Sequence, residues 1–218
     1  MIVLGIDTCL EACSAAVLDG GVVRAAQSLP MARGHQEALA PLVARVAAEA
    51  GLAFADLDRI GVTVGPGSFT GLRVGLAFAK GLGAALGRPV AGVGALAALA
   101  EPHPGLVFSV IDARREQVYL QAFSDGRPLM APDALDLATA AARVAELSGG
   151  GAATLTGSGA ALLADLLFEA KIDPATACDP AAVARLARQA PAGATPRPLY
   201  LRAPDARLPG GRPGPEAA

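Results

Sequence analysis

Two aspartates stand where a carboxylate could bind a metal ion or take part in catalysis, because each closes an apolar run. Asp7 ends the run Ile2–Asp7, and Asp112 ends the run Leu106–Asp112. Carboxylates at the ends of neighbouring strands can hold Mg²⁺ beside the phosphates of a nucleotide. Such a site also needs glycines that let backbone N–H groups approach the phosphate, whereas Asp7 is followed by Thr-Cys-Leu-Glu and Asp112 by Ala-Arg-Arg-Glu. The pattern leaves two interpretations open: a phosphate site, or a pair of structural turn carboxylates.

Other patterns that usually mark catalysis are missing from the sequence. The glycine-rich segment Gly65–Gly71 has neither phosphate-loop spacing nor GxGxxG spacing, since Thr70 occupies the sixth position. The two histidines, His35 and His103, lack partners at metal-ligand spacing, and no GxSxG nucleophile elbow is present. We therefore expect no catalytic residue and no metal site.

The composition excludes several classes of protein. The chain has 218 residues, of which 53% are apolar and 17% charged, so it is too hydrophobic to be disordered and long enough for one large domain or two small lobes. A net charge of −2 disfavours a protein that binds nucleic acid on its own. No signal peptide or membrane span is expected, and three cysteines without a CxxC pair favour a reduced, cytoplasmic chain. The Pro/Gly-rich tail 204–218 is expected to be disordered.

The segment Phe69–Leu86 is predicted to form a helix in which small residues recur at every fourth position and so share one face. Glycine inside a helix costs about 1 kcal/mol relative to alanine, so tight packing must offset the loss. Rows of small residues let two helices approach closely. We expect this close-packing ridge to face a second chain; the alternative is that both faces of the helix are covered within the monomer. The ridge consists of Gly71, Gly75, Ala79 and Gly83.

A second predicted helix, Gly34–Ala50, carries an apolar stripe with helical spacing and is the expected second member of that interface. Its stripe could serve the core or an interface equally well. A basic residue at the edge of an apolar patch, such as Arg73, suits a specific contact. The expected partner-interface residues on the two helices are His35, Leu39, Leu42, Val43, Val46, Phe69, Leu72, Arg73, Leu76, Ala77 and Lys80.

The pattern of the first half of the chain returns in the second half. The segments "LGIDT…CSAAVLDG" and "FSVIDA…QVYLQAFSDG" both predict a strand that ends in aspartate, followed by a strand closed by Asp-Gly. We interpret this as an internal duplication that gives an α/β protein with two lobes, 1–101 and 102–203; the alternative is coincidence between two common hairpins. The second lobe is expected to add helices at Leu137–Leu147 and Ala160–Glu169 around a strand at Thr154–Thr156.

Several segments of the chain resemble the TsaB (YeaZ) family of bacterial tRNA threonylcarbamoyladenosine biosynthesis proteins. The resemblance implies the two-lobed fold of the actin, sugar-kinase and Hsp70 superfamily, a ribonuclease H-like duplication. The segments that carry it are "GPGSFTGLRVGLAFAKGLG" (Gly65–Gly83), "IDARREQVY" (Ile111–Tyr119), "ARGHQEALAP" (Ala32–Pro41), "GIDTCLEACSAAV" (Gly5–Val17) and "PLYLRAPDA" (Pro198–Ala206).

For function, the resemblance implies a subunit of the machinery that attaches a threonylcarbamoyl group to adenosine in tRNA. The family's homologue and partner, TsaD, carries the transferase site with an iron-binding HxxxH motif. The matching positions here are Ala95 and Leu99, which cannot ligate a metal. This chain is thus expected to be a non-catalytic scaffold or activator that pairs with TsaD through first-lobe helices and forms a homodimer when alone. TsaE and the tRNA are further implied contacts.

The nucleotide pocket of the superfamily is only partly recognisable in this sequence. Asp7-Thr8 resembles the first phosphate motif without its glycine, and the segment around Gly157 and Gly159 faintly resembles the adenosine motif. With Asp112, these residues form the expected degenerate remnant of a nucleotide site. We expect no resident cofactor beyond a weak ATP or ADP contact at the partner interface. The alternative function is an ATP-dependent kinase or acyl transferase of the same fold that uses Asp7 and Asp112.

Overall fold

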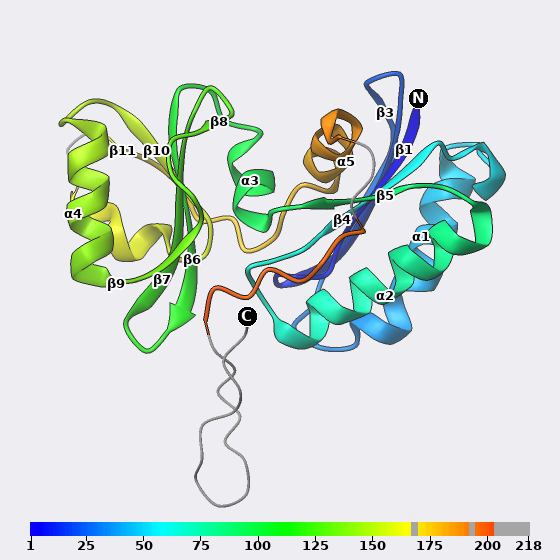
Figure 1. Cartoon of the computed structure of the whole chain (residues 1–218), viewed down its shortest axis with the longest axis horizontal. Coiled ribbons are helices and arrows are strands. Elements are labelled where there is room, and N and C mark those ends of the chain that lie inside the picture. Colours follow the sequence, from blue (N-terminus) through cyan, green and yellow to red (C-terminus); the bar gives the residue numbers. More distant parts are fainter. Residues whose placement is uncertain (167–169, 192–194, 203–218) are drawn as a thin grey trace, which may run out of the picture.

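Two mixed β-sheets stand side by side in the molecule, and each belongs to one lobe (Figure 1). The computed structural model describes residues 1–166, 170–191 and 195–202. The tail 204–218, for which we expected disorder, lies outside the described residues. The expected two-lobed α/β architecture is confirmed.

Among the described residues, five strands form the first sheet, in the order β3-β2-β1-β4-β5. β1 pairs antiparallel with β2, and β2 with β3, whereas β1, β4 and β5 run parallel. The elements of this first half are β1 (Ile2–Asp7), β2 (Ala12–Asp19), β3 (Val22–Pro30), α1 (His35–Glu49), the 3₁₀ helix η1 (Phe54–Asp56), β4 (Arg59–Thr63), α2 (Phe69–Leu86), β5 (Val90–Val93) and α3 (Ala95–Ala100).

The second sheet repeats the central arrangement of the first. β6 pairs antiparallel with β7 and parallel with β10, as β1 does with β2 and β4. The order is β11-β10-β6-β7-β8, and β9 pairs with β7. This repeat is what the duplicated sequence pattern predicts. The elements of the second half are β6 (Leu106–Arg114), β7 (Gln117–Ser124), β8 (Arg127–Pro128), β9 (Asp133–Asp136), α4 (Leu137–Ser148), β10 (Ala153–Thr156), the 3₁₀ helix η2 (Ala160–Leu166), β11 (Ala170–Asp173) and α5 (Pro180–Gln189).

The two faces of the first sheet have separate hydrophobic cores. Successive side chains of a strand point to opposite faces, so Leu4 and Ile6 lie in the core with α1 and α2, while Val3 lies in the core with α5. In Figure 1, α1 and α2 lie on one side of this sheet and α5 on the other. The first sheet is therefore a buried central layer.

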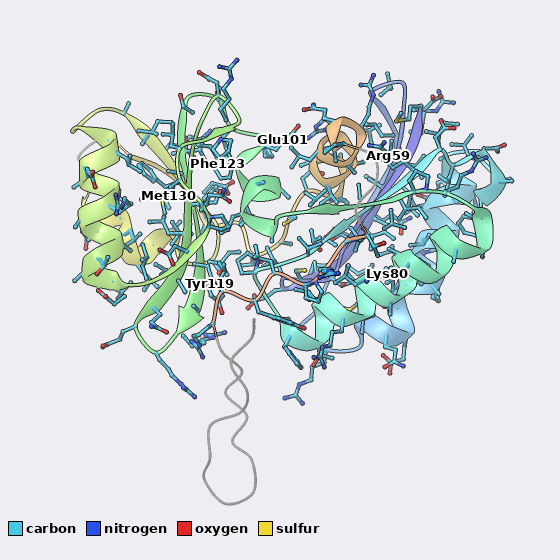
Figure 2. All side chains as sticks on the ribbon, in the orientation of Figure 1. Arg59, Lys80, Glu101, Tyr119, Phe123 and Met130 are labelled. Atoms are coloured by element: carbon cyan, nitrogen blue, oxygen red, sulfur yellow. The ribbon has the colours of Figure 1, made fainter. Side chains whose placement is uncertain are left out.

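Helix α5 belongs to the second half of the sequence but packs against the first sheet. Gly5 and Gly61 make room for it, because a Cβ on Gly5 would lie 2.5 Å from a carbonyl oxygen of α5, and a Cβ on Gly61 would overlap the Ala187 side chain. Arg59 lies beside α5 (Figure 2), and its Nη1 donates to the carbonyl oxygens of Ala187 (2.8 Å) and Ala190 (2.6 Å) at the end of the helix. The expected lobe boundary therefore separates the two sheets but not all of the helices.

The sequence predictions for the second half are partly wrong. The helix predicted at Leu137–Leu147 is present as α4, but no helix was predicted where α5 lies. The segment Ala160–Glu169, predicted as a helix of unstated type, is a 3₁₀ helix over its described part, η2. Its first bonds link the N–H groups of Ala160 and Leu162 to carbonyls three residues earlier, which is the 3₁₀ pattern.

Candidate functional site

The small-residue ridge of α2 faces the chain's own first sheet. A Cβ on Gly71 would overlap the Thr8 carbonyl oxygen, and a Cβ on Gly75 would overlap the Thr8 hydroxyl. A Cβ on Gly83 would lie 2.5 Å from a side chain of β5, and Ala79 is fully buried. Our expectation that a partner packs on this ridge is wrong, because Thr8, which follows β1, and strand β5 already occupy the space beside it.

Most of the expected interface residues are also core residues of the first lobe. A surface helix turns its apolar stripe toward its own core, and α1 follows this rule. A side chain that packs in the lobe's own core has little surface left for a second chain, so the structure does not support the interface prediction for this group, apart from Leu39, which also lines the groove described below. The residues concerned, none of them more than 7% exposed, are His35, Leu39, Leu42, Val43, Val46, Leu72 and Leu76.

Four expected interface residues remain on the outer side of α2. Phe69 is 47% exposed, Arg73 and Ala77 are exposed, and Lys80 is half-buried. The Arg73 guanidinium lies over the Phe69 ring, with Cζ 3.8 Å from the ring centre. Tyr200 joins this group, since its ring centre lies 5.6 Å from that of Phe69 and its hydroxyl accepts a hydrogen bond from Arg73 Nε (3.2 Å). Phe69, Arg73, Ala77 and Tyr200 are termed the α2 patch.

An open groove of about 470 Å³ lies beside the α2 patch, with residues of both α1 and α2 in its walls. Aromatic and arginine side chains are the types that most often anchor protein interfaces. The groove and the α2 patch together thus have the composition of a docking surface. The groove is lined by Gln36, Leu39, Phe69, Thr70, Arg73, Val74, Ala77 and Phe78.

A cavity of about 540 Å³ lies between the two lobes. The first lobe contributes the β1–β2 loop and the loop before α2, and the second lobe contributes the β6–β7 hairpin, where Tyr119 lies between the lobes (Figure 2). Asp112 is half-buried in the cavity wall. Among the described residues, Asp7 is not part of that wall, so the structure does not bring the two aspartates together at the cavity surface.

Asp7 is fully buried at the end of β1. Its Oδ1 accepts hydrogen bonds from Thr63 Oγ1 (2.6 Å) and from the Cys9 N–H (2.9 Å), while Oδ2 has no hydrogen-bond partner among the described residues. Burial raises the pKa of the Asp7 carboxyl, and the hydrogen bond from Thr63 acts against that rise. Asp7 therefore links the end of β1 to the end of β4 inside the first lobe.

The other members of the expected nucleotide-site remnant are engaged within their own lobes. In the first lobe, the Thr8 hydroxyl donates to the Gly71 carbonyl oxygen (2.7 Å). Asp112 accepts a hydrogen bond from the Arg114 N–H (2.7 Å) and pairs with the Arg114 guanidinium at 3.4 Å. The Gly157 N–H donates to a carbonyl of β11 (3.0 Å), and the Gly159 N–H donates to the Val110 carbonyl (2.9 Å). Because both glycine amides are already bonded, they are not free to hold a phosphate.

The buried thiols have no catalytic character. Burial raises the pKa of Cys13 to about 11 and also raises the pKa values of Cys9 and Cys178, and a thiol that stays protonated is a poor nucleophile. In the parts of the chain that the structure describes, no group of three or more His, Cys, Asp or Glu side chains is arranged to hold a metal ion. No helix within those same parts combines the length and the hydrophobicity that crossing a bilayer requires.

Two features near these surfaces escaped sequence reasoning. Tyr200 completes the α2 patch from the far end of the chain, and nothing in the sequence placed it beside α2. The tip of the β6–β7 hairpin has a left-handed backbone at Arg114, Arg115 and Glu116, with φ values of 64°, 54° and 58°. Non-glycine residues rarely adopt this conformation. The tip contains no glycine, so its residue types did not predict a left-handed backbone.

Comparison with known proteins gives consistent matches across the chain. The family model described as TsaD, tRNA N6-adenosine threonylcarbamoyltransferase, matches residues 20–200. A protein of Mycobacterium tuberculosis strain H37Rv is 38% identical over 207 residues, which cover 94% of this chain and 93% of that protein. The Escherichia coli tRNA threonylcarbamoyladenosine biosynthesis protein TsaB is 36% identical over 124 residues, or 55% of this chain and 53% of that protein. The solved structure of YeaZ from Pseudomonas aeruginosa matches with a TM-score of 0.78 at 28% identity, covering 92% of this chain and 99% of that one.

The sequence matches and the structural match agree with the resemblance found in the motifs. The matching family model bears the name of the transferase, while the named E. coli relative and the solved structure are TsaB and YeaZ proteins. The fold likeness to YeaZ spans nearly all of both chains. The chain therefore belongs to the TsaB (YeaZ) family of tRNA threonylcarbamoyladenosine biosynthesis proteins.

Proposed function

We propose that this chain is a non-catalytic subunit of the complex that forms threonylcarbamoyladenosine in tRNA, and that it binds and activates the transferase TsaD. The observation that carries this proposal is the α2 patch. Phe69 is ordered beneath the Arg73 guanidinium and beside the Tyr200 ring, yet it is 47% exposed. An exposed aromatic and arginine cluster beside an apolar groove is typical of a surface that another protein covers.

The first lobe supplies a rigid contact surface. The inner side of α2 is packed so closely against Thr8 and β5 that its glycines leave no space, so the outer side is held in one place. A subunit activates its partner only when it binds the active conformation more tightly than the inactive one. We propose that TsaD, a homologue, presents its corresponding helices to this face, and that two copies of the chain use the same face for a homodimer when TsaD is absent.

Further contacts follow from the same proposal. TsaE and the tRNA would join the complex after the chain has bound TsaD, since a net charge of −2 gives the chain little attraction of its own for RNA. We place the complex in the cytoplasm and assign the chain no resident cofactor. Any contact with ATP or ADP would be weak and would need the partner to complete it.

Of the two aspartates that the ATP-dependent alternative would use, Asp112 lies in the cavity wall and Asp7 does not. Asp7 is fully buried, and the amides of Gly157 and Gly159 are bonded to neighbouring strands. A kinase or acyl transferase would need these groups at the surface of the cavity, where they could contact phosphates. We therefore do not propose it.

The test is a charge placed on the α2 patch. Ala77 is exposed in the middle of α2, and Ala142 is exposed in the middle of α4 on the other lobe. We expect Ala77→Glu to abolish co-purification with TsaD and to reduce formation of modified adenosine, because the contact would remove water from a carboxylate at its centre. Ala142→Glu is the matched control and should leave both unchanged. Thermal unfolding of each variant shows that the fold is intact. Full association and activity of Ala77→Glu would contradict the proposal.

A further inference from the structure

The segment 195–202 runs from the first lobe to the second lobe and contacts both of them. In Figure 1 it is the orange-red stretch that follows α5 and passes toward β6 and β7. In the first lobe, the Leu199 N–H donates to the Val64 carbonyl over 2.8 Å. In the second lobe, Arg202 Nη1 donates to the Ala113 carbonyl (2.8 Å) and to Gln117 Oε1 (3.4 Å). Residues 195–202 are termed the strap.

The first lobe has a shaped seat for the strap. A Cβ on Gly92 would lie 3.0 Å from the Pro196 Cβ, and a Cβ on Gly65 would lie 3.0 Å from the Leu199 carbonyl oxygen. A contact of that length is tighter than Cβ atoms usually make, so a side chain at either position would press on the strap, although Val64 and Leu72 lie still closer, at 2.7 Å. The strap is thus part of the packed structure rather than a loose extension.

The strap also carries one residue of the α2 patch. Tyr200 lies between the first-lobe contact at Leu199 and the second-lobe contact at Arg202. Its ring and hydroxyl meet Phe69 and Arg73. The position of Tyr200 on α2 therefore depends on a segment whose far end is held by the β6–β7 hairpin.

We infer that Arg202 is a positioning residue: by fixing the strap to the second lobe, it holds Tyr200 on α2 and makes the docking face depend on the arrangement of both lobes. The first part of this inference concerns the chain alone. The second part, that docking of TsaD needs Tyr200 in place, rests on the proposed function.

The contact between Arg202 and the β6–β7 hairpin uses a property that arginine has and lysine lacks. A guanidinium has several donors in a fixed plane, so one side chain can reach both a backbone carbonyl and the Gln117 amide oxygen. Lysine keeps the charge and could restore one of these hydrogen bonds, whereas alanine restores none. A graded response to Arg202→Lys and Arg202→Ala would therefore report on the contact itself.

The chain offers a direct probe, because it contains two tyrosines, Tyr119 and Tyr200, and no tryptophan. Labelling the full-length protein with 3-fluorotyrosine gives one ¹⁹F NMR signal for each, and Tyr119→Phe identifies the signal of Tyr200. We expect Arg202→Ala to move the Tyr200 signal toward that of a solvated tyrosine, and Arg202→Lys to move it less. Arg143→Ala, on α4, is the matched control and should leave the signal in place. An unmoved Tyr200 signal in Arg202→Ala would overturn the inference.

The second part is tested by titrating the labelled chain with purified TsaD. We expect the Tyr200 signal to shift on binding, and Arg202→Ala to bind TsaD about tenfold more weakly, the change that removal of one interface anchor commonly causes. If the Tyr200 signal moves in Arg202→Ala but its affinity for TsaD equals that of the parent, while Ala77→Glu does not bind, the coupling fails and the proposed function stands. If Ala77→Glu binds as tightly as the parent, the proposed function fails, whatever the strap does.

Discussion

Thr8 and Gly71 join the end of β1 to the first turn of α2. The Thr8 hydroxyl donates to the Gly71 carbonyl oxygen over 2.7 Å, and the Thr8 carbonyl lies where a Cβ of residue 71 would be. This double contact explains how a helix with several interior glycines is stable, because close packing of helix on strand offsets the lost helix propensity. The ridge belongs to the scaffold of the first lobe, and the docking face lies on the opposite side of the helix.

The first prediction compares two glycines of α2. We expect Gly71→Ala to lower the free energy of unfolding by roughly 1–3 kcal/mol, because the new methyl group overlaps a backbone oxygen that cannot move away cheaply. Gly81→Ala is the matched control, since nothing lies within 4 Å of its would-be Cβ. It should raise the free energy of unfolding by about 1 kcal/mol. Urea unfolding followed by circular dichroism measures both, and equal effects would contradict the packing described for the ridge.

The second prediction concerns the pH dependence that Asp7 confers. Because burial raises its pKa above the ordinary value of 3.8, the folded state binds more protons than the unfolded state between the ordinary and the raised value. Stability must therefore fall as the pH rises through that range. Asp7→Asn keeps an oxygen for the Thr63 and Cys9 hydrogen bonds but does not titrate. We expect a flatter profile of unfolding free energy against pH, with the variant at least as stable as the parent at high pH.

A control of opposite sign is available on the second lobe. The hydrogen bonds from Thr139 lower the pKa of Asp136 at the start of α4. Its ionised form stabilises the folded state above the ordinary pKa, and that contribution is lost as the pH falls through the lowered value. For Asp136→Asn, the difference from the parent should therefore shrink toward low pH. If the free energies of unfolding of the parent and of Asp7→Asn change with pH in the same way, the pKa of Asp7 is ordinary and the second prediction is wrong.

The third prediction concerns thiol reactivity. Cys9, Cys13 and Cys178 are no more than 2% exposed, and their pKa values are raised by burial. Since the thiolate is the reactive form, we expect Ellman's reagent to label the native protein slowly at neutral pH, at a rate set by opening of the fold. In urea all three thiols should react at once. Fast labelling of a thiol under native conditions would mean that the burial described here is wrong.

The fourth prediction separates the proposed function from its ATP-dependent alternative. With Asp7 buried and the Gly159 amide already bonded to Val110, we expect calorimetry of the isolated chain with MgATP to give no binding tighter than about 1 mM, which corresponds to roughly 4 kcal/mol. Micromolar binding that Asp112→Ala removes would instead support the kinase or acyl transferase alternative.

Local signals in the sequence predicted the helices of the first lobe well. The Ser68 side chain accepts a hydrogen bond from the Gly71 N–H, and Gly87 ends α2 with a φ of 64°, as their residue types predict. The predicted helix Gly34–Ala50 is present as α1. The paired strands of both lobes were also predicted, because short apolar runs closed by Asp-Gly are strong hairpin signals.

What covers each helix face could not be predicted from the same signals. Periodicity shows that Gly71, Gly75 and Gly83 share a face, but a sheet and a second chain would both favour small residues there. The same ambiguity applied to Leu39 and Leu42, which lie in the core. The contacts of the strap with both lobes could not be predicted, because an extended segment has no period of its own and its partners lie far away in sequence. Burial of Asp7 likewise depends on residues from several segments.

The return of α5 to the first sheet has a consequence for synthesis of the protein on the ribosome. Residues 1–101 contain every strand of that sheet, yet one of its faces is covered by Val183, Ala184 and Ala187. While the second half is still being translated, that face is open, so an emerging amino-terminal half would present apolar surface to chaperones. The first half therefore cannot complete its fold before α5 has been made. A fragment that ends at the boundary between the sheets should aggregate when it is expressed by itself.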